Sequence, residues 1–79
     1  MIYLLQMMIV DKFDHAPKSV AQYVYSDRIE ASSDYRHLRD SYGLKQVFAD
    51  SGAMERSIGY LESDFGDLEC SLELSRLYL

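Results

Sequence analysis

The sequence predicts a small single domain of the α+β class over residues 1–79. In this fold an N-terminal and a C-terminal strand share one sheet, antiparallel to each other, and two or three helices pack on it. Three observations predict the class. The chain starts with an apolar segment, apolar residues recur at helical spacing in its middle, and apolar and polar residues alternate near its end. A chain of 79 residues suits one domain with one small core.

The first predicted element is a strand over residues 1–10 that is buried on both faces. These residues are apolar apart from Gln6. The segment is too short to span a bilayer, which takes about 20 residues, and it lacks the basic stretch and the small-residue cleavage site of a signal peptide. We therefore expect no association with a membrane. The polar residues 11–18, which include Pro17, predict a loop after this strand.

Two interpretations are open for residues 17–31. Polar residues recur there at spacings of three and four, which favours an amphipathic helix. The alternative is a strand through residues 21–25, because the sequence Tyr-Val-Tyr has high β propensity. The polar stripe on which the helical interpretation rests consists of Ser19, Gln22, Ser26 and Glu30.

Two further helices are predicted in the middle of the chain. The first begins at the possible N-cap residues 32–34 and ends at Gly43, which stands where a C′ glycine belongs. The second follows the break at residues 50–52 and runs from Met54 to Phe65, with apolar residues at helical spacing. The apolar positions that define the two helices are Tyr35, Leu38 and Tyr42, then Met54, Ile58, Leu61 and Phe65.

Strict alternation predicts the C-terminal strand. Four apolar residues alternate with polar ones over residues 68–75, which gives one buried face and one acidic face. Two strands alone are only marginally stable, so helices must cover the sheet or a second subunit must extend it. A homodimer is therefore an open alternative. The alternating residues are Leu68, Cys70, Leu72 and Leu74 against Glu69, Ser71, Glu73 and Ser75.

Residue composition argues against an enzyme, a metal site and a cofactor. Cys70 is the only cysteine, which excludes an intramolecular disulfide and a zinc site of several cysteines. A small domain without disulfides favours the reducing cytoplasm. Cys70 falls on the apolar side of the last strand, within the most acidic part of the chain, whereas a reactive thiolate needs an exposed and electropositive setting. The histidines and carboxylates match no metal-binding spacing, and the glycines form no phosphate-binding loop.

Acidic residues are concentrated in the last third of the chain. Residues 50–79 carry seven acids and two bases, whereas residues 1–49 carry six of each, so this third accounts for the net charge of −5. A surface of one sign selects partners of the opposite sign, and tyrosine suits an interface that is wet on one side. The candidate partner-binding residues are Glu62, Asp64, Asp67, Glu69 and Glu73, with Tyr60 and Tyr78 as anchors.

These observations predict a non-enzymatic protein-binding module. We expect an acidic stoichiometric inhibitor whose carboxylates imitate a line of phosphates and engage the basic surface of a nucleic-acid-binding protein. The phage proteins that block host nucleic-acid-handling enzymes provide the analogy, which operates at the level of class only. The competing explanation is that the acids only keep a small protein soluble.

The main alternative is a transcriptional regulator with a helix-turn-helix over residues 44–61. Gly52 would form the turn of this motif. However, Phe48 occupies a position that normally holds a small residue, and Arg56 is the only base on the face that would read DNA. Because phosphate neutralisation dominates DNA affinity, the sequence disfavours direct DNA binding. A third possibility is an accessory subunit whose strand over residues 1–10 completes a larger assembly.

Overall fold

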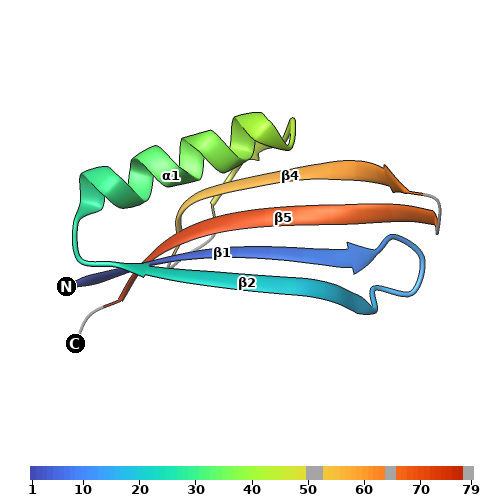
Figure 1. Cartoon of the computed structure of the whole chain (residues 1–79), viewed down its shortest axis with the longest axis horizontal. Coiled ribbons are helices and arrows are strands. Elements are labelled where there is room, and N and C mark those ends of the chain that lie inside the picture. The colour runs from blue at the N-terminus through green and yellow to red at the C-terminus, as the bar shows by residue number, and fades with distance from the viewer. Residues whose placement is uncertain (50–52, 64–65, 78–79) are drawn as a thin grey trace.

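The computed structural model describes residues 1–49, 53–63 and 66–77. Within these residues the chain forms one five-stranded antiparallel sheet with a single helix across one of its faces (Figure 1). The strands lie in the order β2-β1-β5-β4-β3. The elements along the chain are β1 (Ile2–Asp11), β2 (Pro17–Tyr25), α1 (Arg28–Ser41), β3 (Lys45–Val47), β4 (Ala53–Ser63) and β5 (Gly66–Leu77).

The predicted α+β class is confirmed, and so is the pairing of the first and last strands. β1 and β5 lie side by side at the centre of the sheet and are antiparallel over ten residue pairs, from Ile2 with Leu77 to Asp11 with Leu68. The alternation in β5 directs its apolar residues toward α1 and its acidic residues toward the opposite face. The buried residues Cys70, Leu72 and Leu74 are 0% exposed.

The prediction of two or three helices is wrong, because the described residues form only α1. Residues 17–25 are the strand β2, so the alternative strand interpretation of this segment is correct and the helical one is not. β2 pairs along β1 from Tyr3 with Tyr25 to Val10 with Pro17. This pairing provides hydrogen-bond partners for backbone groups of β1 that would otherwise lie at an open edge of the sheet. The hydrogen bonds favour a strand more than the spacing of the polar residues favours a helix.

The predicted helix over residues 54–65 is also wrong, because residues 53–63 form β4. β4 pairs with β5 along its length and directs Ser57 and Gly59 toward the helix-covered face. β3 pairs with the other edge of β4. The segment 44–61 therefore contains two strands and cannot be a helix-turn-helix. The predicted break at residues 50–52 and the position of Phe65 lie outside the described residues.

The end of α1 is confirmed, but its beginning lies earlier than the predicted cap at residues 32–34. Asp27 is extended and its side chain accepts a hydrogen bond of 3.0 Å from the backbone N–H of Ile29, so it is the N-cap. At the other end the helix stops at Tyr42, and Gly43 takes the positive φ of 64° that favours glycine.

The core lies between α1 and the three central strands. Ala31 and Tyr35 are the buried residues of the helix, and they pack with the inward-facing residues of β1 and β5. The Tyr35 hydroxyl hydrogen-bonds to the Ser57 hydroxyl, and both side chains are 0% exposed. This contact satisfies two buried polar groups and ties the helix to β4. Within the described residues no helix is long and apolar enough to cross a membrane.

A second contact ties α1 to the outer strand β2. The Tyr25 hydroxyl donates a hydrogen bond of 2.6 Å to the Asp34 carboxylate. Partial burial, together with this carboxylate, raises the pKa of Tyr25 to about 12. Ionisation of Tyr25 would place a phenolate beside a carboxylate, so the contact holds only while the hydroxyl is protonated.

The substitution Gly59→Ala tests the packing of the β3–β4 side of the sheet. A methyl group at Gly59 would lie 2.7 Å from Leu44 Cδ2, which is closer than van der Waals contact allows. We expect it to lower the free energy of unfolding by about 1–3 kcal/mol in urea titrations. In a Leu44→Val background the clash is relieved, and the same substitution should be neutral or stabilising. Equal losses in both backgrounds would contradict this packing.

Alkaline titration tests the contact between Tyr25 and Asp34. The pKa of Tyr25 lies above its ordinary value of 10.0 in the folded chain, so the unfolded chain loses this proton first. The stabilisation is complete below pH 10 and is lost as pH rises toward 12. We expect Tyr25→Phe to lower the dependence of the urea midpoint on pH in this range. Tyr42→Phe, an exposed tyrosine at the end of α1, is the control and should leave the dependence unchanged.

Candidate functional site

The candidate site is the face of the sheet opposite α1, here called the open face. Within the described residues no element covers it, because the only helix packs on the other side. Side chains alternate between the two faces of each strand, so the register of the sheet fixes the residues of the open face. They form two neighbouring regions, one acidic and one apolar.

The acidic region lies on β4 and β5 and is called the acidic patch. Asp67, Glu69 and Glu73 lie on the same face of β5, where residues i and i+2 stand about 7 Å apart, and Ser71 separates Glu69 from Glu73. Directly across on β4, Glu62 lies opposite Asp67, and Tyr60 lies opposite Glu69. Tyr60 is 64% exposed. The patch therefore presents carboxylates from two strands beside one accessible aromatic ring.

Most of the predicted partner-binding residues come together in this patch. Five of the seven lie on the same face, on two paired strands. The other two, Asp64 and Tyr78, lie outside the described residues.

Basic side chains border the acidic patch at both of its ends. The Lys12 ammonium lies 5.1 Å from the centre of the Tyr60 ring, and the Lys12 backbone N–H donates to the Asp67 carbonyl at 3.1 Å. At the other end, Arg56 lies opposite Glu73 in the register. Because Glu73 also accepts a hydrogen bond from the Ser75 hydroxyl, at 3.1 Å, the carboxylates at the paired positions Glu62 and Asp67 are the less constrained part of the patch.

The turn between β1 and β2 holds Lys12 in place. The Asp11 carboxylate accepts hydrogen bonds from the backbone N–H groups of Phe13, at 2.8 Å, and Asp14, at 3.2 Å. These bonds lower the pKa of Asp11. His15 has a φ of 57°, in the left-handed region, which closes the turn. The ammonium above Tyr60 is therefore presented by an ordered loop.

The apolar region of the open face lies on β1 and β2 and is called the apolar stripe. Val20 and Val24 on β2 are 52% and 65% exposed, and they pair with half-buried residues of β1. The prediction of a first strand buried on both faces is therefore wrong, since α1 covers only one of them. The residues of the apolar stripe are Leu4, Met8, Val10, Val20 and Val24, and the paired residues Gln6 and Gln22 lie on the same face between Leu4 with Val24 and Met8 with Val20.

The apolar stripe was not predicted, although the sequence of residues 1–10 carries a signal for it. Residues 1–10 place apolar side chains on both faces of the strand. A strand that is covered on one face needs apolar residues on that face only. Large exposed apolar patches are typical of interaction surfaces in soluble proteins.

Cys70 takes the buried position that the alternation predicts. Its side chain is 0% exposed on the helix-covered face, and burial raises the pKa of the Cys70 thiol. A buried thiol of raised pKa carries little thiolate at neutral pH and is a poor nucleophile. Among residues 1–49, 53–63 and 66–77, no three histidine, cysteine or acidic side chains gather closely enough to hold a metal ion.

Comparisons with models of protein families, with curated proteins and with solved structures find no match to this chain. The geometry of the open face is therefore the basis for inferring a function.

The burial of Cys70 gives a prediction for thiol labelling. We expect an aromatic disulfide reagent to modify Cys70 at least about a hundredfold more slowly in the native protein than in urea, because modification requires opening of the sheet. The absorbance of the released thiolate measures the rate. Labelling of the native chain at the rate of the unfolded chain would show that Cys70 is accessible and would contradict its place in the core.

Proposed function

We propose that the protein is a non-enzymatic protein-binding module that acts through the open face of its sheet. The observation that supports this most directly is the position of Tyr60, Glu62, Asp67, Glu69 and Glu73 together on the face that α1 leaves uncovered. The same face carries the apolar stripe. An apolar surface beside charged groups is the composition of a protein interface, in which apolar contacts lie inside a polar rim.

The apolar stripe supplies the surface whose burial favours association. Transfer of apolar area out of water contributes about 25 cal/mol per Å², and the stripe spans two adjacent strands with side chains of Leu, Met and Val. Val20 and Val24 gain most from being covered, because they are more than half exposed in the free chain. A partner that lies across β1 and β2 would also cover the outer edge of the sheet at β2, which is a pairing edge.

The acidic patch selects the charge of the partner. A row of carboxylates on β5, joined by Glu62 on β4, favours a partner surface rich in lysine and arginine. Asp67 and Glu69 are successive open-face residues of β5 and Glu62 lies opposite Asp67, so these three carboxylates resemble a short line of phosphates. This supports the more specific proposal that the partner is a nucleic-acid-binding protein and that the module inhibits it stoichiometrically by occupying its basic surface.

A charge-reversal pair tests the acidic patch. We expect Glu62→Lys with Glu69→Lys to slow association with the partner at least about tenfold at low salt and to weaken its salt dependence, because steering by complementary charge acts mainly on the association rate. The partner is first isolated with the wild-type chain from lysate of the source cells. Surface plasmon resonance at two salt concentrations then measures the rates for each variant.

The matched control is Glu30→Lys with Asp40→Lys on α1, which changes the net charge equally on the opposite side of the molecule. Both residues are exposed, and the ion pair of Asp40 with Arg39, at 3.1 Å, lies at the surface and adds little stability. If the control slows binding as much as the patch variant, only net charge matters and the proposed surface is wrong. If Val24→Ser leaves the dissociation rate unchanged, the apolar stripe is not part of the interface.

A further inference from the structure

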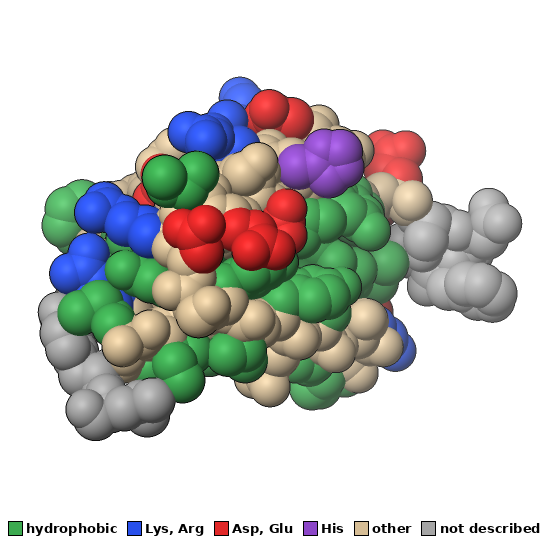
Figure 2. All heavy atoms as spheres, turned by 60° about the vertical axis from the view of Figure 1, so that its left-hand side comes forward, with side chains coloured by type: hydrophobic (Ala, Val, Ile, Leu, Met, Phe, Trp, Pro, Cys, Tyr) green, Lys and Arg blue, Asp and Glu red, His purple; other side chains and the backbone are tan. Residues whose placement is uncertain are grey.

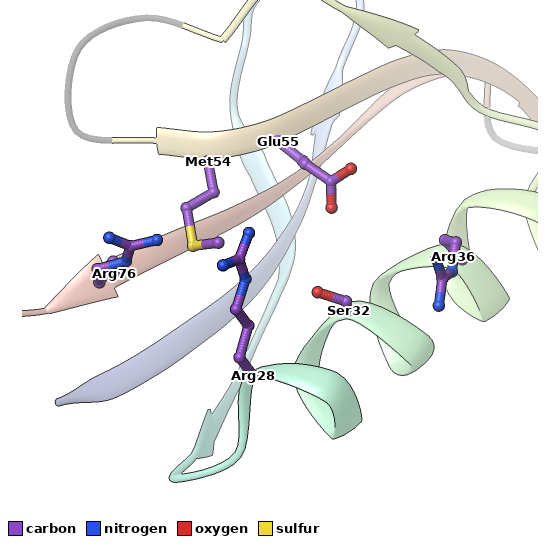
Figure 3. A pocket seen from close by; sticks show the side chains of 6 residues that line it. All are labelled: Arg28, Ser32, Arg36, Met54, Glu55 and Arg76. Carbon is purple, nitrogen blue, oxygen red and sulfur yellow. The ribbon is translucent and has the colours of Figure 1, made fainter.

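A polar cavity of about 450 Å³ lies between α1 and the adjoining ends of β4 and β5. It is separate from the open face, because it lies on the side of the sheet that α1 covers. At the end of the molecule shown in Figure 2, Lys and Arg side chains gather toward one side. Figure 3 shows the six residues that line the cavity: Arg28, Ser32, Arg36, Met54, Glu55 and Arg76.

The helical wall of the cavity is a single stripe of α1. Arg28, Ser32 and Arg36 are spaced by four residues, so they lie one above another on the same face of the helix. At 1.5 Å per residue, the Cα atoms of the two arginines stand about 12 Å apart along the axis, with the Ser32 hydroxyl between them. The stripe therefore offers two guanidinium groups at separate positions, together with one hydroxyl group that can donate or accept.

The sheet wall depends on an irregularity at the start of β4. Adjacent residues of a regular strand point to opposite faces, yet Met54 and Glu55 both line the cavity. The register of β4 against β5 shifts between Ala53 and Glu55, and such bulges re-aim side chains. Arg76 of β5 lies beside Met54 in Figure 3, and Arg28 reaches toward the same methionine from the helix.

The charges of the lining residues favour an anionic ligand. Three arginines and one carboxylate line the cavity, and this carboxylate, that of Glu55, accepts a hydrogen bond of 3.4 Å from Gln46 Nε2. Within the described residues the guanidinium groups of Arg28 and Arg36 make no hydrogen bond or ion pair. Arginine binds phosphate and carboxylate groups through paired hydrogen bonds, so these two side chains are available for such a ligand.

We propose that this cavity binds a small ligand that carries two linked phosphate groups. The separation of Arg28 and Arg36 along α1 suits two anionic groups better than one, and Ser32 lies where the bridge between them would pass. Arg76 completes the cluster from the sheet. The volume lies within the range of small-molecule sites. Inorganic pyrophosphate and nucleoside diphosphates share the required chemistry.

Titration of the isotope-labelled full chain, followed by NMR of its backbone amides, tests the proposal. The probes are inorganic pyrophosphate, adenosine diphosphate and orthophosphate, compared at equal ionic strength. We expect pyrophosphate to shift the amides of residues 28–36, 54–55 and 76, and to bind about tenfold more tightly than orthophosphate. If adenosine diphosphate binds more tightly than pyrophosphate, the diphosphate group of the ligand belongs to a nucleotide. If adenosine diphosphate binds more weakly, the ligand is the inorganic ion.

Variants on both walls decide whether the cavity is responsible. Arg28→Gln and Arg36→Gln should each weaken pyrophosphate binding about tenfold. Arg39→Gln is the matched control, because Arg39 lies on the same helix but pairs with Asp40 and Gln46 instead, and it should leave the affinity unchanged. Glu55→Gln removes the carboxylate of the cavity and should strengthen binding severalfold, an effect that loss of folding cannot produce.

The proposal is overturned by any of three results. The first is that pyrophosphate binds no more tightly than orthophosphate. The second is that the amide shifts caused by pyrophosphate spread over basic residues far from the cavity. The third is that the Arg28→Gln and Arg36→Gln variants bind pyrophosphate as well as the wild type does. Because the acidic patch is on the opposite face of the sheet, reversal of its charges by Glu62→Lys and Glu69→Lys should change the affinity for pyrophosphate less than either arginine variant does.

Discussion

The docking of one helix on the sheet is the constraint on which the rest of the structure depends. Ala31 and Tyr35 anchor α1, and the buried hydrogen bond between Tyr35 and Ser57 fixes its position over the central strands. A helix of 14 residues is about 21 Å long, whereas the 12 residues of β5 extend about 40 Å. One such helix can cover only part of one face. The open face and the arginine cavity at the edge of the helix both follow from this shortage of cover.

The elements that could be predicted from the sequence are those whose two faces lie in different environments. β5 alternates because one face meets the core, and the end of α1 is marked by Gly43. The strands that were taken for helices lack this signal. β2 is an edge strand that is exposed at most positions on both faces, so packing imposed no alternation on it. β4 directs Ser57 and Gly59 to the core. Ser57 provides the hydrogen-bond partner of the buried Tyr35 hydroxyl, and Gly59 leaves space for the Leu44 side chain. These reasons lie in other segments of the chain.

The same distinction explains what could be predicted of the two candidate sites. The acidic residues are close in sequence and lie on two paired strands that are consecutive in the chain, so their clustering needed only local information. To predict the apolar stripe, one would have to know that α1 covers only one face of the sheet. The cavity combines one face of α1 between Arg28 and Arg36, a bulge in β4 and the end of β5. No local pattern joins Arg28 to Arg76, which are brought together only by the complete sheet.

The pairing of β1 with β5 also determines when the protein can fold. The hairpin of β1 and β2 is the first part of the sheet to leave the ribosome, but the inner neighbour of β1 is the last strand of the sheet to be synthesised. The loop that this pairing closes spans most of the chain, so the central contacts are the most distant ones in sequence. We therefore expect the sheet to be completed only after β5 has been synthesised, and folding to be slower than in domains of this size whose contacts are mostly local.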